Sequence, residues 1–283
     1  MEAPFSWAWH PHPDAWLLVG ILVIGYRIAL RRRERTSTDP FEVVSTRRQR
    51  GLFYGGCLAL LISGEWPIHD LAEGYLYSVH MIQHLMLTLL VAPLLLAGLP
   101  AWLFRKLLPG PLMRVARTLS RPLIALIVAN SVLVLTHWPL LVNRSISDEF
   151  LHLGLHVVVV VAAWIMWMPV LSPVLEIPKL AKPTQAGYLF LQSLVPTVPA
   201  SFLTFGAAPL YKAYEMFPHP FGVSTLDDQR TAGLIMKLVG GSVLWIVITV
   251  IFFAWFSMES RHGVDALAHA GTDRDLDRME LRS

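Results

Sequence analysis

The sequence predicts an all-α integral membrane protein, a bundle of seven transmembrane helices with its N-terminus outside and its C-terminus in the cytoplasm. Two observations carry this prediction: several long runs contain no charged residue, and the basic residues cluster on one side of these runs. Of the 283 residues, 54% are hydrophobic and only 15% are charged, whereas a soluble domain has about 25% charged residues. The mean hydropathy of +0.52 agrees with a chain that lies mainly in lipid.

Seven runs are long enough to cross a bilayer, which takes about 18 or more predominantly apolar residues. The clearest, residues 75–98 and 150–171, contain no Asp, Glu, Lys or Arg. Loops rich in proline, glycine and charge separate the runs. Pro196 and Pro199 should kink the sixth helix, because proline removes a backbone hydrogen bond. The predicted spans are residues 15–30, 51–67, 75–98, 121–138, 150–171, 186–206 and 231–256.

These spans imply one membrane domain, residues 1–256. Residues 257–283 are charged and contain no aromatic residue, a composition typical of a solvated segment without a core. We therefore expect a flexible cytoplasmic tail.

The basic residues set the predicted orientation. Nineteen of the 23 lysines and arginines lie on one side, from the last turn of span 1 through the loop after it, from the end of span 3 to the start of span 4, in the loop after span 5 and in the tail after span 7. Such residues mark the cytoplasmic side, and an odd number of spans agrees with termini on opposite sides. The membrane also explains the net charge of +3, so no nucleic-acid partner is inferred. The single cysteine, Cys57, excludes a disulfide framework and a CxxC motif.

The histidines are distributed unevenly with respect to this orientation. His262 and His269 lie in the tail. The other nine of the eleven fall at the outer face or in the outer half of a span; they are His10, His12, His69, His80, His84, His137, His152, His156 and His219.

Two histidine pairs have the spacing of one helical face. His80 and His84 are four residues apart in span 3, and His152 and His156 are four apart in span 5. Both helices enter the membrane from outside. At about 1.5 Å per residue, the two pairs lie at overlapping depths, roughly 4 to 13 Å below the helix starts. The sequence therefore predicts that four imidazoles converge on a metal in the outer half of the bundle.

Further ligating side chains follow the same helix faces. They are interpreted as additional metal ligands or as partners that orient the imidazoles. These residues are Glu73, Glu149, Asp228, Met81 and Met236. The HPHP sequence at His10 and His12 is interpreted as a solvated interfacial segment, with a metal-collecting arm as the less favoured alternative.

The ligand types leave several cofactors open. Imidazole suits copper, zinc, iron and nickel, while thioethers favour Cu(I). Two stacked haems fit poorly, because each pair places both histidines at nearly one level. A zinc hydrolase stays open, since such enzymes combine three protein ligands, a water and a carboxylate base.

Four blocks of the sequence resemble the bacterial caa3-type CtaG family. These blocks are HMIQHLMLTLLVAPLLLAGLP, LHLGLHVVVVVAAWIMWMPVL, APLYKAYE and STLDDQRTAGLIMKLVGG, and the resemblance extends from about residue 8 to 256. The chain departs from the family at one position of these blocks: it has Lys237 where the family commonly has an aromatic residue. The family's motifs fall on His80, Met81, Gln83 and His84, on His152 and His156, and on Asp228, Gln229 and Ala232 to Met236.

The resemblance implies a seven-span assembly factor of the bacterial plasma membrane that matures cytochrome c oxidase. It implies copper handling as the role, with oxidase subunits or other assembly factors as partners, and it favours an assembly factor over an enzyme. Copper is the predicted metal and zinc the alternative. Two other functions stay open: an intramembrane zinc-dependent hydrolase, and a copper permease, which would need a second ligand set in the inner half.

Overall fold

The structure is a computed structural model that describes residues 8–39, 41–219 and 221–280, with side chains up to Ser260. All regular secondary structure in these residues is helical, as predicted. Five segments are long and apolar enough to cross a membrane, and they correspond to predicted spans 1, 3, 5, 6 and 7. They are Pro13–Thr36, Tyr77–Gly98, Glu149–Leu171, Lys182–Phe205 and Thr225–Ser260.

The two remaining predicted spans are bent helix pairs. Helices α2 (Arg47–Ser63) and α3 (Ile68–Gly74) meet at 46°, and α7 (Gly110–Leu119) and α8 (Pro122–Thr136) meet at 84°. Neither α2 nor α8 alone reaches the roughly 20 residues of an ordinary span. The described chain therefore has five membrane-crossing helices, or up to seven if each bent pair counts as one span.

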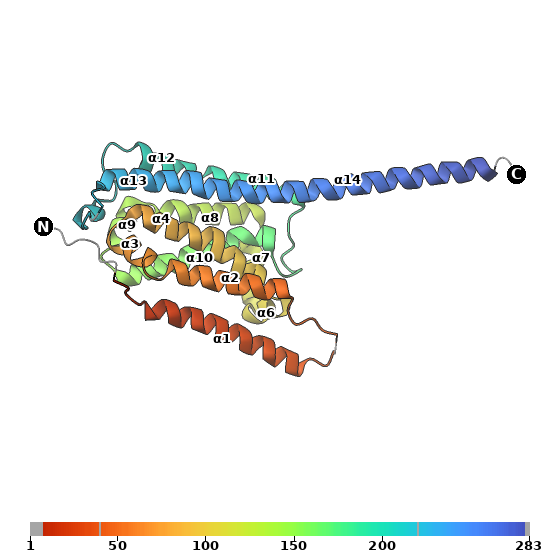
Figure 1. Cartoon of the computed structure of the whole chain (residues 1–283), viewed down its shortest axis with the longest axis horizontal. Coiled ribbons are helices and arrows are strands. Elements are labelled where there is room, and N and C mark those ends of the chain that lie inside the picture. The colour runs from red at the N-terminus through yellow and green to blue at the C-terminus, as the bar shows by residue number, and fades with distance from the viewer. Residues whose placement is uncertain (1–7, 40, 220, 281–283) are drawn as a thin grey trace.

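The helices form a bundle with α1 (Pro13–Thr36) at one edge, packed on α2 (Figure 1). Helices α8 and α10 (Glu149–Leu171) pack together in the middle, and α11 and α14 pack together at the opposite edge. The remaining elements are α4 (Tyr77–Leu85), α5 (Ala92–Gly98), α6 (Ala101–Leu107), α9 (Pro139–Ser145), α11 (Lys182–Leu194), α12 (Thr197–Phe205), η2 (Lys212–Met216), α13 (Thr225–Leu234) and α14 (Gly240–Glu280).

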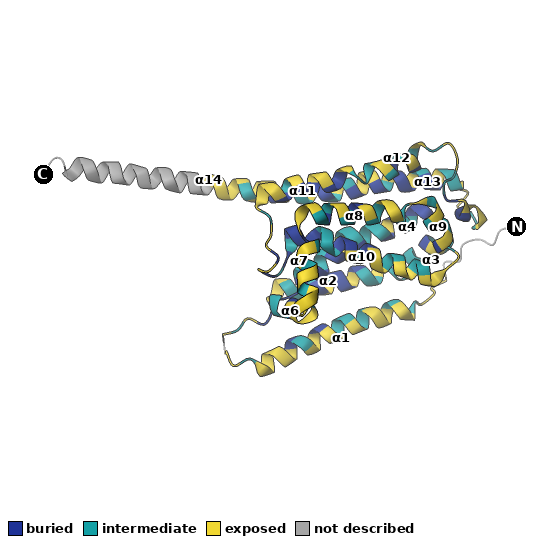
Figure 2. Cartoon of the chain, turned by 180° about the vertical axis from the view of Figure 1, so that it is seen from behind, coloured by how far each residue is buried: buried dark blue, intermediate teal, exposed yellow. Residues whose placement is uncertain are grey.

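Helix α14 extends beyond the bundle to Glu280 (Figure 1). Helices α11 and α12 are separated at Pro196, where the sequence predicts a kink. The faces of α1 and α14 that point away from the bundle are largely exposed (Figure 2). Exposed Leu17, Ile21, Trp245 and Ile246 lie there, as expected for helices that contact lipid.

The main core joins α1, α2 and α5. The rings of Tyr26 and Phe53 stack with centroids 3.9 Å apart, and Tyr26 Oη donates to the carbonyl of Gly98 at 3.0 Å. A Cβ on Gly98 would lie 2.5 Å from the backbone nitrogen of Phe53. Only glycine allows this approach, a common way of packing helices closely in a membrane.

A second core lies at the opposite end of the bundle from the α1–α2 loop. It contains Tyr77 and Met81 of α4, Leu203 of α12, Tyr211, and Met236. This core fixes the start of α4 against α12 and α13, and thereby positions the first of the paired histidines. We call this end, which carries the paired histidines, the histidine end.

Two π-helices lie next to this core. One, η1 (Met86–Val91), continues α4 directly, and the other, η3 (Ile235–Val239), joins α13 to α14. Gly240, directly after η3, packs closely against Leu85, directly before η1. A Cβ on Gly240 would lie 3.1 Å from the side chain of Leu85. Such local widenings of a helix are frequent at functional sites.

Candidate metal centre

The paired histidines of α4 and α10 face one another inside the bundle. Ring centroids are 4.4 Å apart for His80 and His84 and 4.5 Å apart for His152 and His156. Across the helices, His84 and His156 are 5.0 Å apart and His80 and His152 are 5.5 Å apart. The structure thus brings together all four imidazoles that the helical spacing assigns to one site.

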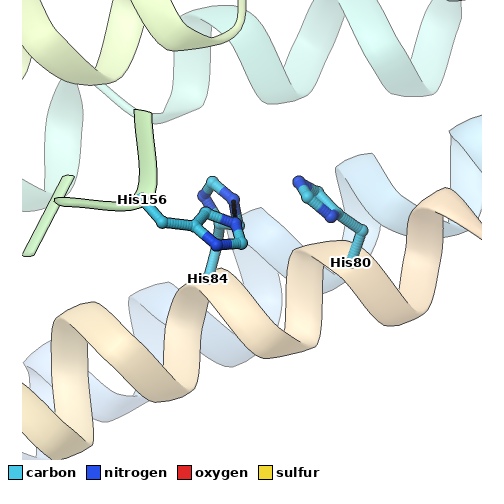
Figure 3. Close-up of side chains that lie close together, drawn as sticks. All are labelled: His80, His84 and His156. Atoms are coloured by element: carbon cyan, nitrogen blue, oxygen red, sulfur yellow. Dashed lines mark hydrogen bonds between the residues drawn. The ribbon is translucent and has the colours of Figure 1, made fainter. Parts of the chain in front are cut away.

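Three of these histidines have the geometry of a metal-binding triad. Ligating nitrogens of His80, His84 and His156 all lie within 4.8 Å of one another, and Nε2 of His84 lies 3.1 Å from Nε2 of His156. Two nitrogens bound at about 2.05 Å to one tetrahedral metal would be roughly 3.3 Å apart. Figure 3 shows the three rings projecting into the same space between the helices. We call this set the deep triad.

Unsatisfied nitrogens support a ligand at this position. Nδ1 of His80 is buried without a hydrogen-bond partner, and Nε2 of His152 is buried with only the Glu73 carboxylate 3.3 Å away, outside hydrogen-bond geometry. An unpaired buried polar atom costs about 1–3 kcal/mol, so such atoms usually have an unseen partner. The rings border a cavity of about 30 Å³, which has room for a metal ion or a water. Imidazole donors of this kind suit copper and zinc.

A second possible triad overlaps the first. Glu73 at the end of α3, His152 and His156 also hold ligating atoms within 4.8 Å of one another. Oε1 of Glu73 lies 3.3 Å from Nε2 of His152. We call this set the rim triad, because Glu73 is exposed whereas the histidines are partly buried. His156 belongs to both triads.

Asp228 has a structural role at the start of α4. Its Oδ2 accepts from the backbone nitrogen of Tyr77 at 2.6 Å and its Oδ1 from that of Ser78 at 3.2 Å, and the Ser78 hydroxyl also donates to Oδ1. The first turn of a helix has no intrahelical acceptors for these groups. Asp228 therefore caps α4 from α13 and fixes the helix that carries His80.

The other predicted carboxylate and the methionines lie at different places. Glu149 is exposed in the first turn of α10 and does not line the histidine cavity in the described chain. Met81 is buried and lines this cavity. Met236 is buried beside Met81 in the second core. Both methionines line a larger, mostly apolar cavity of about 110 Å³, in which His84 is the only member of the four histidines.

Three tyrosines close the histidine end. The ring of Tyr77 lies 4.6 Å from Tyr211 and 5.2 Å from Tyr214, and Tyr211 Oη donates to the carbonyl of His137. Burial raises the pKa of Tyr211 to about 12, so this phenol stays a hydrogen-bond donor at neutral pH. The APLYKAYE block, which contains Tyr211 and Tyr214, thus packs over the site.

The sequence places His69 at the outer face and Gln83 in a family motif, but it did not assign either residue to the site. His69 Nδ1 lies 3.6 Å from Glu73 Oε1 one helical turn away, and the four-residue spacing in HDLAE was the available signal. Gln83 Nε2 donates to the carbonyl of Ser63 at 2.8 Å and lies 3.4 Å from His69 Nδ1. No local signal identified this contact, since it depends on how α3 folds back on α4.

These features define a class, a helical membrane protein with a histidine-lined site buried near one end of its bundle. Residues 7–258 match the family described as cytochrome c oxidase caa3 assembly factor, Caa3_CtaG. The chain belongs to this family, which confirms the resemblance seen in the sequence blocks. Comparisons with curated proteins and with solved structures gave no match.

Proposed function

We propose that this protein is an assembly factor for cytochrome c oxidase that binds copper in the deep triad. In this proposal the histidine end faces the outside of the bacterial plasma membrane. The protein makes the metal available to oxidase subunits or to other assembly factors. The convergence of three imidazoles around the unpaired Nδ1 of His80 supports this proposal.

The chain's own residues would hold, orient and shield the metal, which is cargo here. Asp228 and the second core fix the start of α4, so His80 and His84 are preorganised on one face. Tyr77 and Tyr214 line the cavity and would restrict the entry of water. Neutral imidazoles would not balance the positive charge of a bound metal. Glu73 is the carboxylate that can supply negative charge beside His152.

A zinc hydrolase is the second candidate, and one observation favours it. Glu73 lies where a carboxylate base would be needed, beside a three-ligand metal site. The cavity at the histidines is about 30 Å³, and Glu73 does not line it in the described chain. A carboxylate outside the cavity supports metal storage and release over hydrolysis.

A copper permease fits less well. Transport would need ligands on both sides of the membrane midplane. Among the described residues, both groups of three or more His, Cys, Asp or Glu side chains lie at the histidine end. This distribution of ligating side chains supports a site that is loaded and unloaded from one side.

The test compares the purified full chain with the variant H80A/H84A/H156A after loading with Cu(I). We expect the wild-type protein to retain copper and the triple variant to retain none above background. A matched control, H262A/H269A, removes two histidines from the tail and should retain copper normally. In a deletion strain, the triple variant should leave oxidase polypeptides present but short of copper. Full copper in either the variant or its oxidase would refute the proposal.

A further inference from the structure

Two tryptophans attach the start of the described chain to the bundle, Trp9 before α1 and Trp16 in the first turn of α1. Trp9 Nε1 donates to Oε1 of Glu65 at 3.1 Å, and Trp16 Nε1 donates to Oε2 of the same carboxylate. The two indole rings lie 6.2 Å apart. Glu65 belongs to the short connection between α2 and α3. The residues between the tryptophans are therefore held over α3.

Two histidines of this segment contact one carboxylate of α3. Nε2 of His12 lies 2.6 Å from Oδ1 of Asp70, and Nδ1 of His10 lies 3.1 Å from Oδ2. The side chain of His10 is 57% exposed, whereas those of His12 and Asp70 are 21% and 18% exposed. We call His10, His12 and Asp70 the entry group. His10 is open to solvent, and the other two members are mostly covered.

Further ligating groups connect the entry group to the rim triad. The ring of His12 lies 4.4 Å from that of His69. His69 Nδ1 is 3.6 Å from Glu73 Oε1, and the same Oε1 is 3.3 Å from His152 Nε2. The side chain of His152 is 16% exposed. Histidines and carboxylates thus follow one another without a gap from solvent to the buried site.

We propose that this series is the route by which metal enters the protein. Metal is captured by the entry group, passes His69 to the rim triad, and moves to the deep triad. The proposal rests on the function proposed above and adds the direction and the residues of loading. It assigns to the HPHP segment the metal-collecting role that the sequence alone favours less than a solvated segment.

Each transfer is a ligand exchange without redox chemistry. A new metal–nitrogen or metal–oxygen bond forms as an earlier one breaks, and the metal keeps its oxidation state. Each neutral imidazole binds the metal through its unprotonated nitrogen and keeps its proton on the other ring nitrogen, while a carboxylate exchanges its hydrogen bond for a bond to the metal. The last step needs two such exchanges, in which His80 and His84 replace Glu73 and His152, because His156 is common to the rim and deep triads and stays bound.

A purely structural explanation accounts for less of this arrangement. The segment is already attached by the bonds from Trp9 and Trp16 to Glu65. One histidine would be enough to pair with Asp70, yet both imidazoles converge on it, and the more exposed one adds little stability as a surface pair. The two explanations differ in what the loss of His10 and His12 should change.

The experiment measures how fast the full-length protein in detergent takes Cu(I) from its coloured complex with bicinchoninate. Loss of a group that supports a metal site typically lowers metal affinity or activity by about 10- to 100-fold. We expect H10A/H12A to load about tenfold more slowly than wild type, at the lower end of this range. Its final copper content should equal that of the wild type. The control H262A/H269A should load at the wild-type rate. The conservative variant D70N should be slow like H10A/H12A, because the amide is a poorer ligand than the carboxylate.

The outcomes separate this proposal from the function beneath it. Equal loading rates for H10A/H12A and wild type would refute the entry route while leaving the deep triad intact. A lower final copper content in H10A/H12A would also refute it, because the arm would then be part of the final site. Copper uptake that is absent in wild type, or unchanged in H80A/H84A/H156A, would overturn both proposals. If H10A/H12A melts at a lower temperature, H69Q inside the bundle repeats the rate test.

Discussion

The two ends of the bundle use polar residues in opposite ways. At the end with the α1–α2 loop, which we call the arginine end, guanidinium groups pair with carboxylates at the surface. Arg105 forms two bonds with Glu176 at 2.7 and 3.0 Å, and Arg33 lies 2.8 Å from Glu42. At the histidine end, imidazoles are gathered inside the bundle, and Nδ1 of His80 is buried without a hydrogen-bond partner.

This difference indicates where the protein's chemistry lies. Exposed ion pairs are satisfied by each other and by water, and each contributes little to stability. Buried unsatisfied nitrogens are unfavourable, so the unpaired nitrogen of His80 supports the proposal that a ligand binds there. The arginine end is suited to setting orientation, and the histidine end to binding a metal.

The largest effect is expected in a topology experiment, because orientation gives an all-or-none signal. Reporter fusions after Arg35 should report the cytoplasm and fusions after Val142 the exterior, since basic residues stay inside. A fusion after Glu65 should report the exterior if α2 crosses the membrane. Reversed signals at Arg35 and Val142 would place the histidine end inside and remove the proposed direction of loading. A cytoplasmic signal at Glu65 would show that α2 does not span.

A smaller effect is expected from the cap on α4. Asp228→Ala leaves the backbone donors of Tyr77 and Ser78 unpaired in a buried position, and should lower the free energy of unfolding by about 2–3 kcal/mol. The measurement is denaturant unfolding in mixed micelles, followed by copper retention at a temperature where the variant stays folded. We also expect weaker retention, because α4 carries His80 and His84.

The matched control is Asp227→Ala in the same helical turn. Asp227 is exposed, and its side chain accepts from the Ser224 hydroxyl, so its loss should cost at most about 1 kcal/mol, as for an ordinary helix cap. Equal destabilisation by the two variants would contradict the assignment of Asp228 as the cap of α4.

The sequence predicted the helical class, the five continuous spans and the two histidine pairs, because these depend on local composition and on four-residue spacing. The four-residue spacing puts His80 and His84 on one helix face. The similar depth of the two histidine pairs in the membrane predicts that they lie near His156. Which of Glu73, Glu149 and Asp228 lies beside the histidines depends on how the helices pack. The 46° bend between α2 and α3 is one such feature. Such features arise from packing between helices, so the sequence did not distinguish the three carboxylates.

The short spans were harder to predict for a related reason. Residues 51–67 and 121–138 are apolar throughout most of their length, yet each belongs to a helix that bends sharply near one end. The bend at Pro122 follows from proline at the first turn of α8, which starts a new helix after α7. Composition alone identifies the apolar run and leaves open whether a bent pair crosses the membrane.

The smallest effect is expected at the arginine end. Glu176→Gln removes the partner of Arg105, but both side chains are more than 40% exposed, so the melting temperature and copper content should stay unchanged within error. The hydrogen bond from Arg105 lowers the pKa of Glu176 below 4.5. Any stabilisation by this pair is therefore confined to neutral pH and is lost as the pH falls through the acid range. The melting curves of wild type and variant should differ by no more than the experimental error near pH 7 and should coincide at acid pH. A clear loss of copper in Glu176→Gln would contradict the separation of roles between the two ends, since it would couple a surface ion pair to the deep triad.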